Sequence, residues 1–365
     1  MHVYCHVPFC VRRCSYCDFA IAVRREVPSD AYVAALLREW SAWLPHPVWG
    51  ASPAIRTIYF GGGTPSLLAP RGIAALVERI RADRPVDPDA EITLEANPDD
   101  VTPAAARAWR AAGVTRLSLG AQSFSNDALR WMHRTHDSAA IGRAVDAARA
   151  AGIADLSLDL IFALPTDVTR SWEDDLARAL ALAPDHVSLY GLTTEPRTPL
   201  ARWTAAGRVR TADDARYAAD YLLAHERLEA AGLEHYEISN AGRPGHRARH
   251  NSAYWRRAPY IGLGPSAHSG FGNHRRWNLR EWAEYEGALT RGDGWVAGEE
   301  TLDPAAVRLE QVYLGLRTVE GVPREWVPGH RASEWADQGW ARLGPEDLRL
   351  TVEGWLRLDA LAATL

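Results

Sequence analysis

The sequence predicts an α/β fold in which a parallel sheet coils into a full or partial barrel, followed by a smaller and mainly helical C-terminal region. Three observations predict this fold. Apolar, β-branched runs alternate with longer helical patterns through the first half of the 365-residue chain. Glycine-rich and polar motifs stand where these runs end, and the pattern changes after about residue 195. The length also suits one large α/β domain with a smaller second one.

The six apolar runs have the length and composition of strands. They cover residues 3–7, 55–60, 92–95, 116–119, 156–161 and 186–189. Helical patterns lie between them, and several open on Ser, Asp or Pro in capping positions. They cover residues 30–44, 70–83, 103–112, 138–151 and 170–182. Consecutive strand-then-helix units of this kind imply a parallel sheet.

The second half of the chain has a different organisation. A helical pattern at 212–232 and a strand at 235–239 precede a segment rich in Arg, His and Gly, and a helical tail with several Trp begins at about residue 279. The chain ends on a short strand, a turn at Glu353 and Gly354, and an amphipathic helix. We therefore expect a barrel in 1–235, a connecting segment in 236–278 and a C-terminal domain in 279–365.

Composition narrows the class of protein. A hydrophobic content of 47% with 24% charged residues is typical of a soluble globular protein. No apolar run is long enough for a membrane span and no signal peptide is visible, so we expect a cytoplasmic protein. The net charge of −5 gives no general attraction to nucleic acid, and the exclusive use of Arg over Lys is best explained by genome composition.

Unusual residues gather at the carboxyl ends of the expected strands. The motifs CVRRCSYC, GGGTPS, EANPDD, GAQSF, DLIFALP and YGLTTE stand at the ends of the six strands in that order. Gly, Asn and Pro are also common in ordinary turns, which would explain any one of these loops. Because β/α barrels build their active sites at this end, six such loops together favour a functional site.

Three of the four cysteines stand close together, at Cys10, Cys14 and Cys17. In a chain of this length they do not form a disulfide framework, so we expect metal ligands. A structural zinc site has four protein ligands, whereas a cubane iron–sulfur cluster held by three thiolates leaves one iron without a protein ligand. Cys5 and His6 could supply a fourth ligand, but both lie in the first strand and point to opposite faces. Cys5 is better explained as a small core residue.

At this point the sequence resembles the radical S-adenosylmethionine (SAM) superfamily. In that superfamily C-x3-C-x2-C carries a [4Fe–4S] cluster, and the amino acid end of SAM chelates the open iron, which explains the missing fourth cysteine. Tyr16, before the last cysteine, and the GGGTP motif at 61–65 also match. The resemblance implies a partial (β/α)6 radical SAM barrel with a smaller, mainly helical C-terminal domain.

The resemblance also implies where SAM binds. Glycines 61–63 would let the backbone approach the charged methionyl end, and Glu95 could accept hydrogen bonds from a ribose or ammonium group. Without the resemblance, each of these polar residues could equally be explained by a role in a turn or by exposure at the surface. The residues expected to bind SAM are Tyr4, Tyr16, Gly62, Gly63, Thr64, Glu95, Gln122, Arg134, Asp159 and Gly191.

Motifs over nearly the whole chain narrow the resemblance to the oxygen-independent coproporphyrinogen III oxidase-like family, in which two subgroups compete. The oxidase itself has a further cysteine two residues after the third cluster ligand, where this chain has Phe19, and a longer segment before its cluster. The HemW-type haem chaperones resemble this chain more, since their pattern contains CDF and H-N-x-x-Y-W. The chain departs from the family pattern at Cys5, Phe162 and Ala163, which leaves the fine shape of the substrate side open.

The H-N-x-x-Y-W motif begins at His250 and ends at Tyr254 and Trp255. A neutral imidazole is a suitable axial ligand for haem iron, and the two aromatic rings could flank a flat macrocycle. A solvated basic loop with a capping His is the alternative. The residues that could pair with haem propionates are Arg247, Arg249, Arg256 and Arg257.

The resemblance thus implies a chaperone that holds a [4Fe–4S] cluster and SAM, carries haem as cargo and transfers it to respiratory proteins. Its cluster and cofactor would support dimerisation and haem transfer, and the chaperone would contact a membrane protein transiently; no motif identifies an electron donor. Reduction of the cluster could also cleave SAM to a 5′-deoxyadenosyl radical, chemistry that chaperone members need not use. The alternatives are oxidative decarboxylation of coproporphyrinogen III and radical chemistry on another tetrapyrrole or small molecule.

Overall fold

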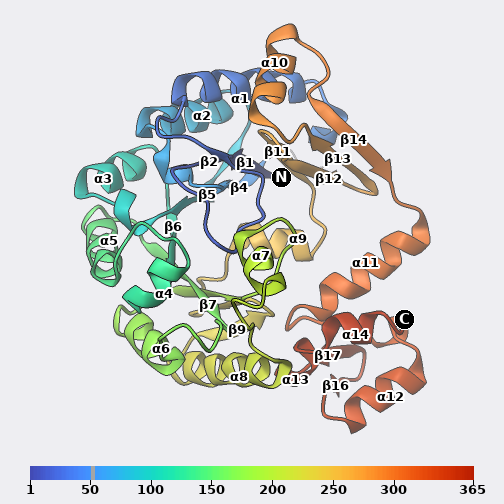
Figure 1. The fold of residues 1–365 in the computed structure, drawn as a ribbon. Helices are drawn as coiled ribbons and strands as arrows, with labels where there is room; N and C mark the ends of the chain where they lie inside the picture. Colours follow the sequence, from blue (N-terminus) through green and yellow to red (C-terminus); the bar gives the residue numbers. More distant parts are fainter. Residues whose placement is uncertain (51–53) are drawn as a thin grey trace.

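The computed structural model describes residues 1–50 and 54–365, which form a curved sheet with helices on its outer face and a smaller C-terminal region beside it (Figure 1). The sheet has twelve strands in the order β14-β13-β12-β11-β1-β4-β5-β6-β7-β8-β10-β9. Six consecutive members of this order are parallel and are the six predicted strands. They are β1 (His2–Val7), β4 (Ile55–Gly62), β5 (Val86–Ala96), β6 (Arg116–Gln122), β7 (Asp155–Phe162) and β8 (His186–Gly191).

The helices predicted in the first half and at 212–232 also form and cover the outer face of the sheet (Figure 1). Several begin where a side-chain oxygen of Thr102, Asp137, Ser171 or Asp213 accepts a backbone N–H of the first turn, which satisfies a donor that the helix leaves free. The helices are α1 (Ser29–Trp43), α2 (Pro70–Asp83), α3 (Pro103–Ala111), α5 (Ser138–Ala150), α6 (Trp172–Ala181) and α8 (Asp214–Ala230).

The two faces of the parallel strands differ in chemistry. In β1, Val3, Cys5 and Val7 are fully buried in the apolar core. The alternate residues point to the opposite, inner face, where the Tyr4 hydroxyl meets His6 and the Tyr4 ring lies beside Tyr59 of the neighbouring strand. The inner face of the curved sheet is therefore polar, and its side chains are available to a site inside the barrel.

Further strands extend both ends of the sheet, and of these the sequence predicted only β9, as a strand at 235–239. Strand β11 (Tyr260–Leu263) pairs parallel with β1 and is followed by antiparallel β12 (His268–Phe271), β13 (His274–Asn278) and β14 (Val296–Thr301). At the other end β10 (Asn240–Gly242) and β9 (Glu234–Glu237) are antiparallel. The predicted helical tail from residue 279 is wrong in part, since only α10 (Trp282–Arg291) precedes β14, whose VAGEET sequence is mostly exposed and lacks an apolar alternation.

The C-terminal region has its own apolar core, which includes Val312, Leu316, Trp335, Leu348 and Trp355. Helices α11 (Pro304–Leu316) and α12 (Gly329–Asp337) pack here with a sheet of β15 (Val322–Pro323), β17 (Asp347–Leu350) and β16 (Ala341–Leu343), so the region is less helical than expected. Trp282, Tyr285 and Leu289 of α10 belong to the main core instead. The predicted domain boundary at residue 279 remains a prediction.

The expected turn at Glu353 and Gly354 is instead a short helix, α13 (Val352–Trp355), because the Thr351 hydroxyl accepts the N–H of Gly354 at 3.2 Å and caps it. The amphipathic end helix forms as α14 (Leu358–Ala362). No helix in the described residues is long and apolar enough to cross a membrane. The remaining elements are β2 (Phe9–Cys10), β3 (Ala22–Val23), η1 (Pro47–Gly50), η2 (Pro65–Leu67), η3 (Pro98–Asp100), α4 (Asn126–Trp131), α7 (Pro199–Ala205), α9 (Arg249–Trp255) and η4 (Arg324–Trp326).

Candidate functional site

The loops that follow the six parallel strands meet at one cavity of about 510 Å³. The three clustered cysteines lie in its wall with nine of the ten residues expected to bind SAM. Tyr4 is the exception, because it lies one layer deeper, with its hydroxyl 3.1 Å from His6 Nδ1. The cavity lining contains Cys10, Cys14, Cys17, Tyr16, Gly62, Gly63, Thr64, Glu95, Gln122, Arg134, Asp159 and Gly191.

The cysteine loop is held against the glycine loop. A Cβ on Gly63 would lie 2.8 Å from Phe9 O and 3.0 Å from Cys10 Sγ, so only glycine allows this approach. The Thr64 hydroxyl donates to Cys10 Sγ at 3.4 Å. Burial raises the pKa of Cys10 and raises that of Cys17 to about 11. Ligation by metal would have to displace these protons.

The two alternative fourth ligands lie apart from this cavity. Cys5 is fully buried in the core, where burial raises its pKa. The ring of His6 is held by Tyr4 on one nitrogen and by Ala20 O, at 3.1 Å, on the other. The structure therefore agrees with Cys5 as a core residue and leaves three cysteines at the cavity.

Glu95 organises the floor of the cavity. Its Oε1 accepts the Tyr59 hydroxyl at 2.7 Å, and its Oε2 accepts the N–H of Gly62 at 3.0 Å, where the backbone has φ +114°. Burial raises the pKa of Glu95 to about 7, the bonds from Tyr59 and Gly62 oppose this rise, and the nearby Asp159 adds to it. Glu95 thus fixes the glycine loop and can gain or lose a proton near neutral pH. Tyr59 was not among the predicted site residues.

Arg134 connects the cysteine loop with two strands. Its guanidinium donates to Cys14 Sγ at 3.5 Å, to Gly120 O at 3.0 Å and to Asn97 Oδ1. Its Nε is buried and has no partner in the described parts of the chain, so one donor remains for a bound group. Asn97 was missed as a site residue, although the EANPDD motif contained it.

Asp159 and Gln122 also line the cavity. Asp159 accepts the Ser118 hydroxyl at 2.9 Å, and burial raises the pKa of Asp159 to about 6. Gln122 has φ +65°, which turns it at the end of β6. At the mouth, the side chains of Phe19 and Tyr190 are 59% and 47% exposed. This apolar rim around a polar floor suits a ligand with both kinds of surface.

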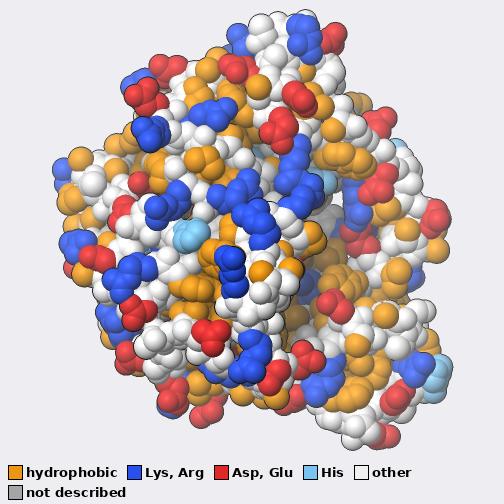
Figure 2. Space-filling model, in the orientation of Figure 1, with side chains coloured by type: hydrophobic (Ala, Val, Ile, Leu, Met, Phe, Trp, Pro, Cys, Tyr) orange, Lys and Arg blue, Asp and Glu red, His pale blue; other side chains and the backbone are white. Residues whose placement is uncertain are grey.

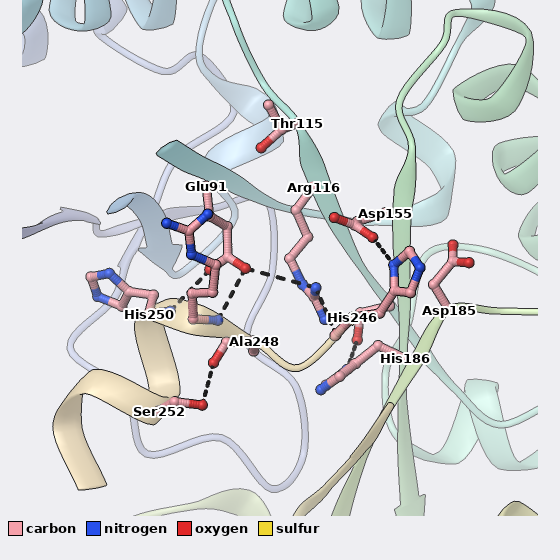
Figure 3. Close-up of polar contacts among 12 residues, drawn as sticks. Glu91, Thr115, Arg116, Asp155, Asp185, His186, His246, Ala248, His250 and Ser252 are labelled. Carbon is pink, nitrogen blue, oxygen red and sulfur yellow. Dashed lines mark hydrogen bonds and ion pairs between the residues drawn. The ribbon is translucent and has the colours of Figure 1, made fainter. Parts of the chain in front are cut away.

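The H-N-x-x-Y-W motif lies elsewhere, at the amino ends of the strands. It forms α9, whose first residues are fixed by Glu91: the carboxylate accepts the N–H groups of Arg249 and His250, each at 3.0 Å (Figure 3). Arg116 lies 3.8 Å from Glu91 and donates to His246 O at 3.1 Å, which holds the preceding loop (Figure 3). The motif is therefore anchored on β5 and β6.

His250 does not have the exposure expected of an iron ligand. Its side chain is buried, with Nδ1 2.6 Å from the Thr57 hydroxyl and Nε2 2.8 Å from the Tyr254 hydroxyl. Both ring nitrogens are therefore occupied, and neither is presented to a ligand in this conformation. Tyr254 and Trp255, by contrast, line a second cavity of about 550 Å³.

The four arginines proposed for propionates are all paired with carboxylates of the chain. Arg247 lies 3.3 Å from Glu234 and Arg249 lies 3.4 Å from Asp89, both largely exposed pairs. Arg256 pairs with Glu320, and Arg257 Nε lies 2.6 Å from Glu310. Only Arg257 lines the second cavity.

The curved parallel sheet and the cavity lined by three cysteines together indicate one class of protein, the radical SAM superfamily. A family model of the radical SAM superfamily matches residues 4–179, over the first five parallel strands, the cysteines and the glycine loop. In fold, 99% of the chain matches 88% of coproporphyrinogen III oxidase (HemN) from Escherichia coli, with a TM-score of 0.82 at 22% identity.

Sequence comparison with curated relatives identifies the family within the radical SAM superfamily. The chain is 37% identical over 376 residues to heme chaperone HemW of Mycobacterium tuberculosis, which covers 100% of this chain and 94% of the relative. It is 39% identical over 270 residues to heme chaperone HemW of Escherichia coli, covering 73% of this chain and 69% of the relative. The chain belongs to the HemW family of the radical SAM superfamily. A mitochondrial radical SAM domain-containing protein 1 of Danio rerio is also similar, at 32% identity over 387 residues.

Membership of the radical SAM superfamily implies a [4Fe–4S] cluster and SAM, and the donor set at the cavity fits both. Three thiols on one loop suit a cluster with an open iron, and the orphan Arg134 Nε and the Gly63 cradle leave donors and space beside it. As the side chains stand, the described residues contain no group of three or more His, Cys, Asp or Glu arranged to hold a metal ion. The fit therefore rests on the thiols and the cavity that they line.

Proposed function

We propose that this protein binds haem and delivers it to haem proteins such as those of respiration, with the cluster and SAM at the cysteine cavity. The observation that carries the proposal is the alignment of relatives named heme chaperone HemW along the whole chain, C-terminal region included. The protein acts in the cytoplasm, as a homodimer that contacts a membrane-bound recipient transiently.

The residues of the cavity have distinct tasks in this proposal. Cys10, Cys14 and Cys17 hold the cluster, and the backbone at Gly62 and Gly63 approaches the methionyl end of SAM. Glu95 holds the glycine loop in place, and Arg134 donates to the Cys14 sulfur, which stabilises negative charge on that thiolate. When bound and reduced, the cluster can supply an electron to the sulfonium, although haem delivery does not require it.

Oxidative decarboxylation of coproporphyrinogen III is the alternative to test. The match to coproporphyrinogen III oxidase is one of fold, and at 22% identity it carries no argument about the reaction. At the position where the oxidase subgroup has a further cysteine, this chain places Phe19, which is 59% exposed at the cavity mouth and supplies no thiol.

Two measurements on the anaerobically reconstituted protein test the proposal. Equilibrium titration should show saturable binding of one haem per chain. Incubation with coproporphyrinogen III, SAM and a reductant should give no protoporphyrinogen IX. Formation of that product, together with no saturable haem binding, would show that the chain is the enzyme.

A further inference from the structure

One strand holds residues of both regions that the proposed function uses. Strand β4 leads into the glycine loop of the cysteine cavity. Two residues on its inner face, Thr57 and Tyr59, meet His250 of the H-N-x-x-Y-W motif. The Thr57 hydroxyl lies 2.6 Å from His250 Nδ1, and the Tyr59 ring lies beside the His250 ring, with centroids 4.9 Å apart and planes 31° apart. His250 therefore rests on β4.

Tyr59 also reaches the floor of the cysteine cavity. Its hydroxyl donates to Glu95 Oε1 at 2.7 Å, and Glu95 lines that cavity. The ammonium and ribose hydroxyl groups of SAM are donors of the kind that a carboxylate accepts. A single side chain thus touches a residue of the expected SAM site with its hydroxyl and a residue of the expected haem motif with its ring.

The packing around Tyr59 leaves little room for independent movement. A Cβ on Gly61 would lie 2.7 Å from the Tyr59 ring and 3.0 Å from Glu95 Oε1. The same Cβ would lie 3.0 Å from the Tyr4 ring. The Tyr4 ring lies beside those of Tyr59 and His250, at centroid distances of 5.9 and 6.2 Å. Because close-packed groups transmit displacements, a shift of Tyr59 changes the support of the His250 ring.

The haem motif is closed in this conformation. The His250 side chain is buried, and its Nε2 lies 2.8 Å from the Tyr254 hydroxyl. Tyr254 lines the second cavity, and the surface is hollowed between strands β12–β14 and the C-terminal region (Figure 2). A haem that enters this cavity meets Tyr254 before it reaches His250. Ligation of iron by His250 therefore requires the bond between these two side chains to open.

We propose that Tyr59 couples the SAM site to the haem motif, so that SAM bound at Glu95 favours the opening of His250; the inference rests on the proposed function. A donor group of SAM that takes Glu95 Oε1 displaces the Tyr59 hydroxyl, and the released ring no longer supports His250 in its closed position. SAM and haem then raise the affinity of the protein for each other by the same factor, as linkage requires. Tyr59 is a positioning residue, because it acts on haem only through His250.

The test measures this factor in the anaerobically reconstituted protein. Haem is titrated with and without saturating SAM by its Soret absorbance, and SAM is titrated with and without haem by calorimetry. In the wild type we expect each ligand to bind about tenfold more tightly when the other is present. Tyr59→Phe keeps the ring and lacks the hydroxyl. Its haem affinity without SAM should already equal that of the SAM-bound wild type, and the factor should fall to about one.

Tyr285→Phe is the matched control. The Tyr285 hydroxyl also donates to a buried carboxylate, that of Glu39, but in the main core on α10, and neither residue lines the cysteine cavity or the second cavity. The variant therefore loses the same kind of hydrogen bond and should keep the tenfold factor. Far-UV circular dichroism checks that each variant is folded.

Each other outcome has a definite meaning. If the wild type binds both ligands and neither changes the affinity for the other, the coupling is absent and the proposed function stands. A factor that persists in Tyr59→Phe would overturn the assignment, and so would a factor lost equally in Tyr285→Phe, which would indicate general disruption. Mutual weakening of the two ligands would overturn the proposed direction. If the wild type shows no saturable haem binding, the proposed function fails and this inference with it.

Discussion

Removal of the buried Glu91 carboxylate should destabilise the protein strongly and release the H-N-x-x-Y-W segment. Glu91 and Arg116 are 6% and 3% exposed and lie 3.8 Å apart, and Glu91 also accepts two backbone N–H groups of α9 (Figure 3). Unit charges about 4 Å apart attract by about 4 kcal/mol at the effective dielectric of a protein. Breaking a buried pair by removing one partner costs about 3–5 kcal/mol, because the other charge stays buried.

We therefore expect Glu91→Gln to lower the free energy of unfolding by about 3 kcal/mol, since the amide oxygen can still accept an N–H group. Urea denaturation, followed by circular dichroism under anaerobic conditions, measures the change. Glu234→Gln is the matched control, because its ion pair with Arg247 is largely exposed and should be worth less than about 1 kcal/mol.

A double-mutant cycle separates the ion pair from general disruption. In Glu91→Gln with Arg116→Met no uncompensated charge remains, so the double variant should be more stable than the sum of the single changes by about 2 kcal/mol. Additive effects within about 0.5 kcal/mol, or a loss in Glu91→Gln no larger than in Glu234→Gln, would refute the reasoning.

Three further changes have direct readouts. Because the pKa of Glu95 is about 7, SAM affinity should fall about tenfold from one pH unit above that value to one unit below it, as the carboxylate gains a proton. Glu95→Gln should remove most of this pH dependence and leave only the part that Asp159 contributes. Calorimetric titration with SAM at several pH values measures both effects. Cys14→Ala should abolish the visible thiolate-to-iron absorbance of the reconstituted protein, whereas Cys5→Ala should keep it; an intact spectrum in Cys14→Ala would contradict the cluster assignment. A Cβ at Gly262 would collide with His268 O, so Gly262→Ala should cost about 1–3 kcal/mol in urea denaturation. Gly142→Ala should not destabilise the protein, because its Cβ would only touch Leu182 at 4.0 Å.

The parallel core of the sheet could be predicted because its strands carry a strong local signal. In 156–161, for example, Leu156, Leu158 and Leu160 are buried in the apolar core and alternate with Ser157 and Asp159 of the inner face. Glycine and polar residues mark the carboxyl ends of the same strands, so the cluster cysteines and nine of the ten expected SAM residues could be placed at the cavity. Other lining residues, such as Asn97, His133 and Thr193, were missed, as was Tyr59 behind Glu95. Tyr59 was missed because its hydroxyl acts through Glu95 rather than at the end of a strand.

The outer strands and the depth of His250 could not be predicted in the same way. Strands β12–β14 are short and rich in His, Arg, Glu and Gly, since much of their surface is exposed, so they lack the alternation that indicates a strand. The burial of His250 depends on Glu91, more than 150 residues earlier in the chain, and on Thr57. A basic, His-containing sequence gives no local sign of such long-range contacts.

Transfer of haem to an acceptor distinguishes a haem chaperone from a protein that only binds haem. The reconstituted protein is loaded with one equivalent of haem, freed of excess, and mixed with a haem-free acceptor protein whose haem-bound spectrum differs from that of the donor. We expect saturable loading followed by transfer to the acceptor faster than from free haem. Haem that never binds saturably, or that binds and never leaves for an acceptor, would contradict a chaperone.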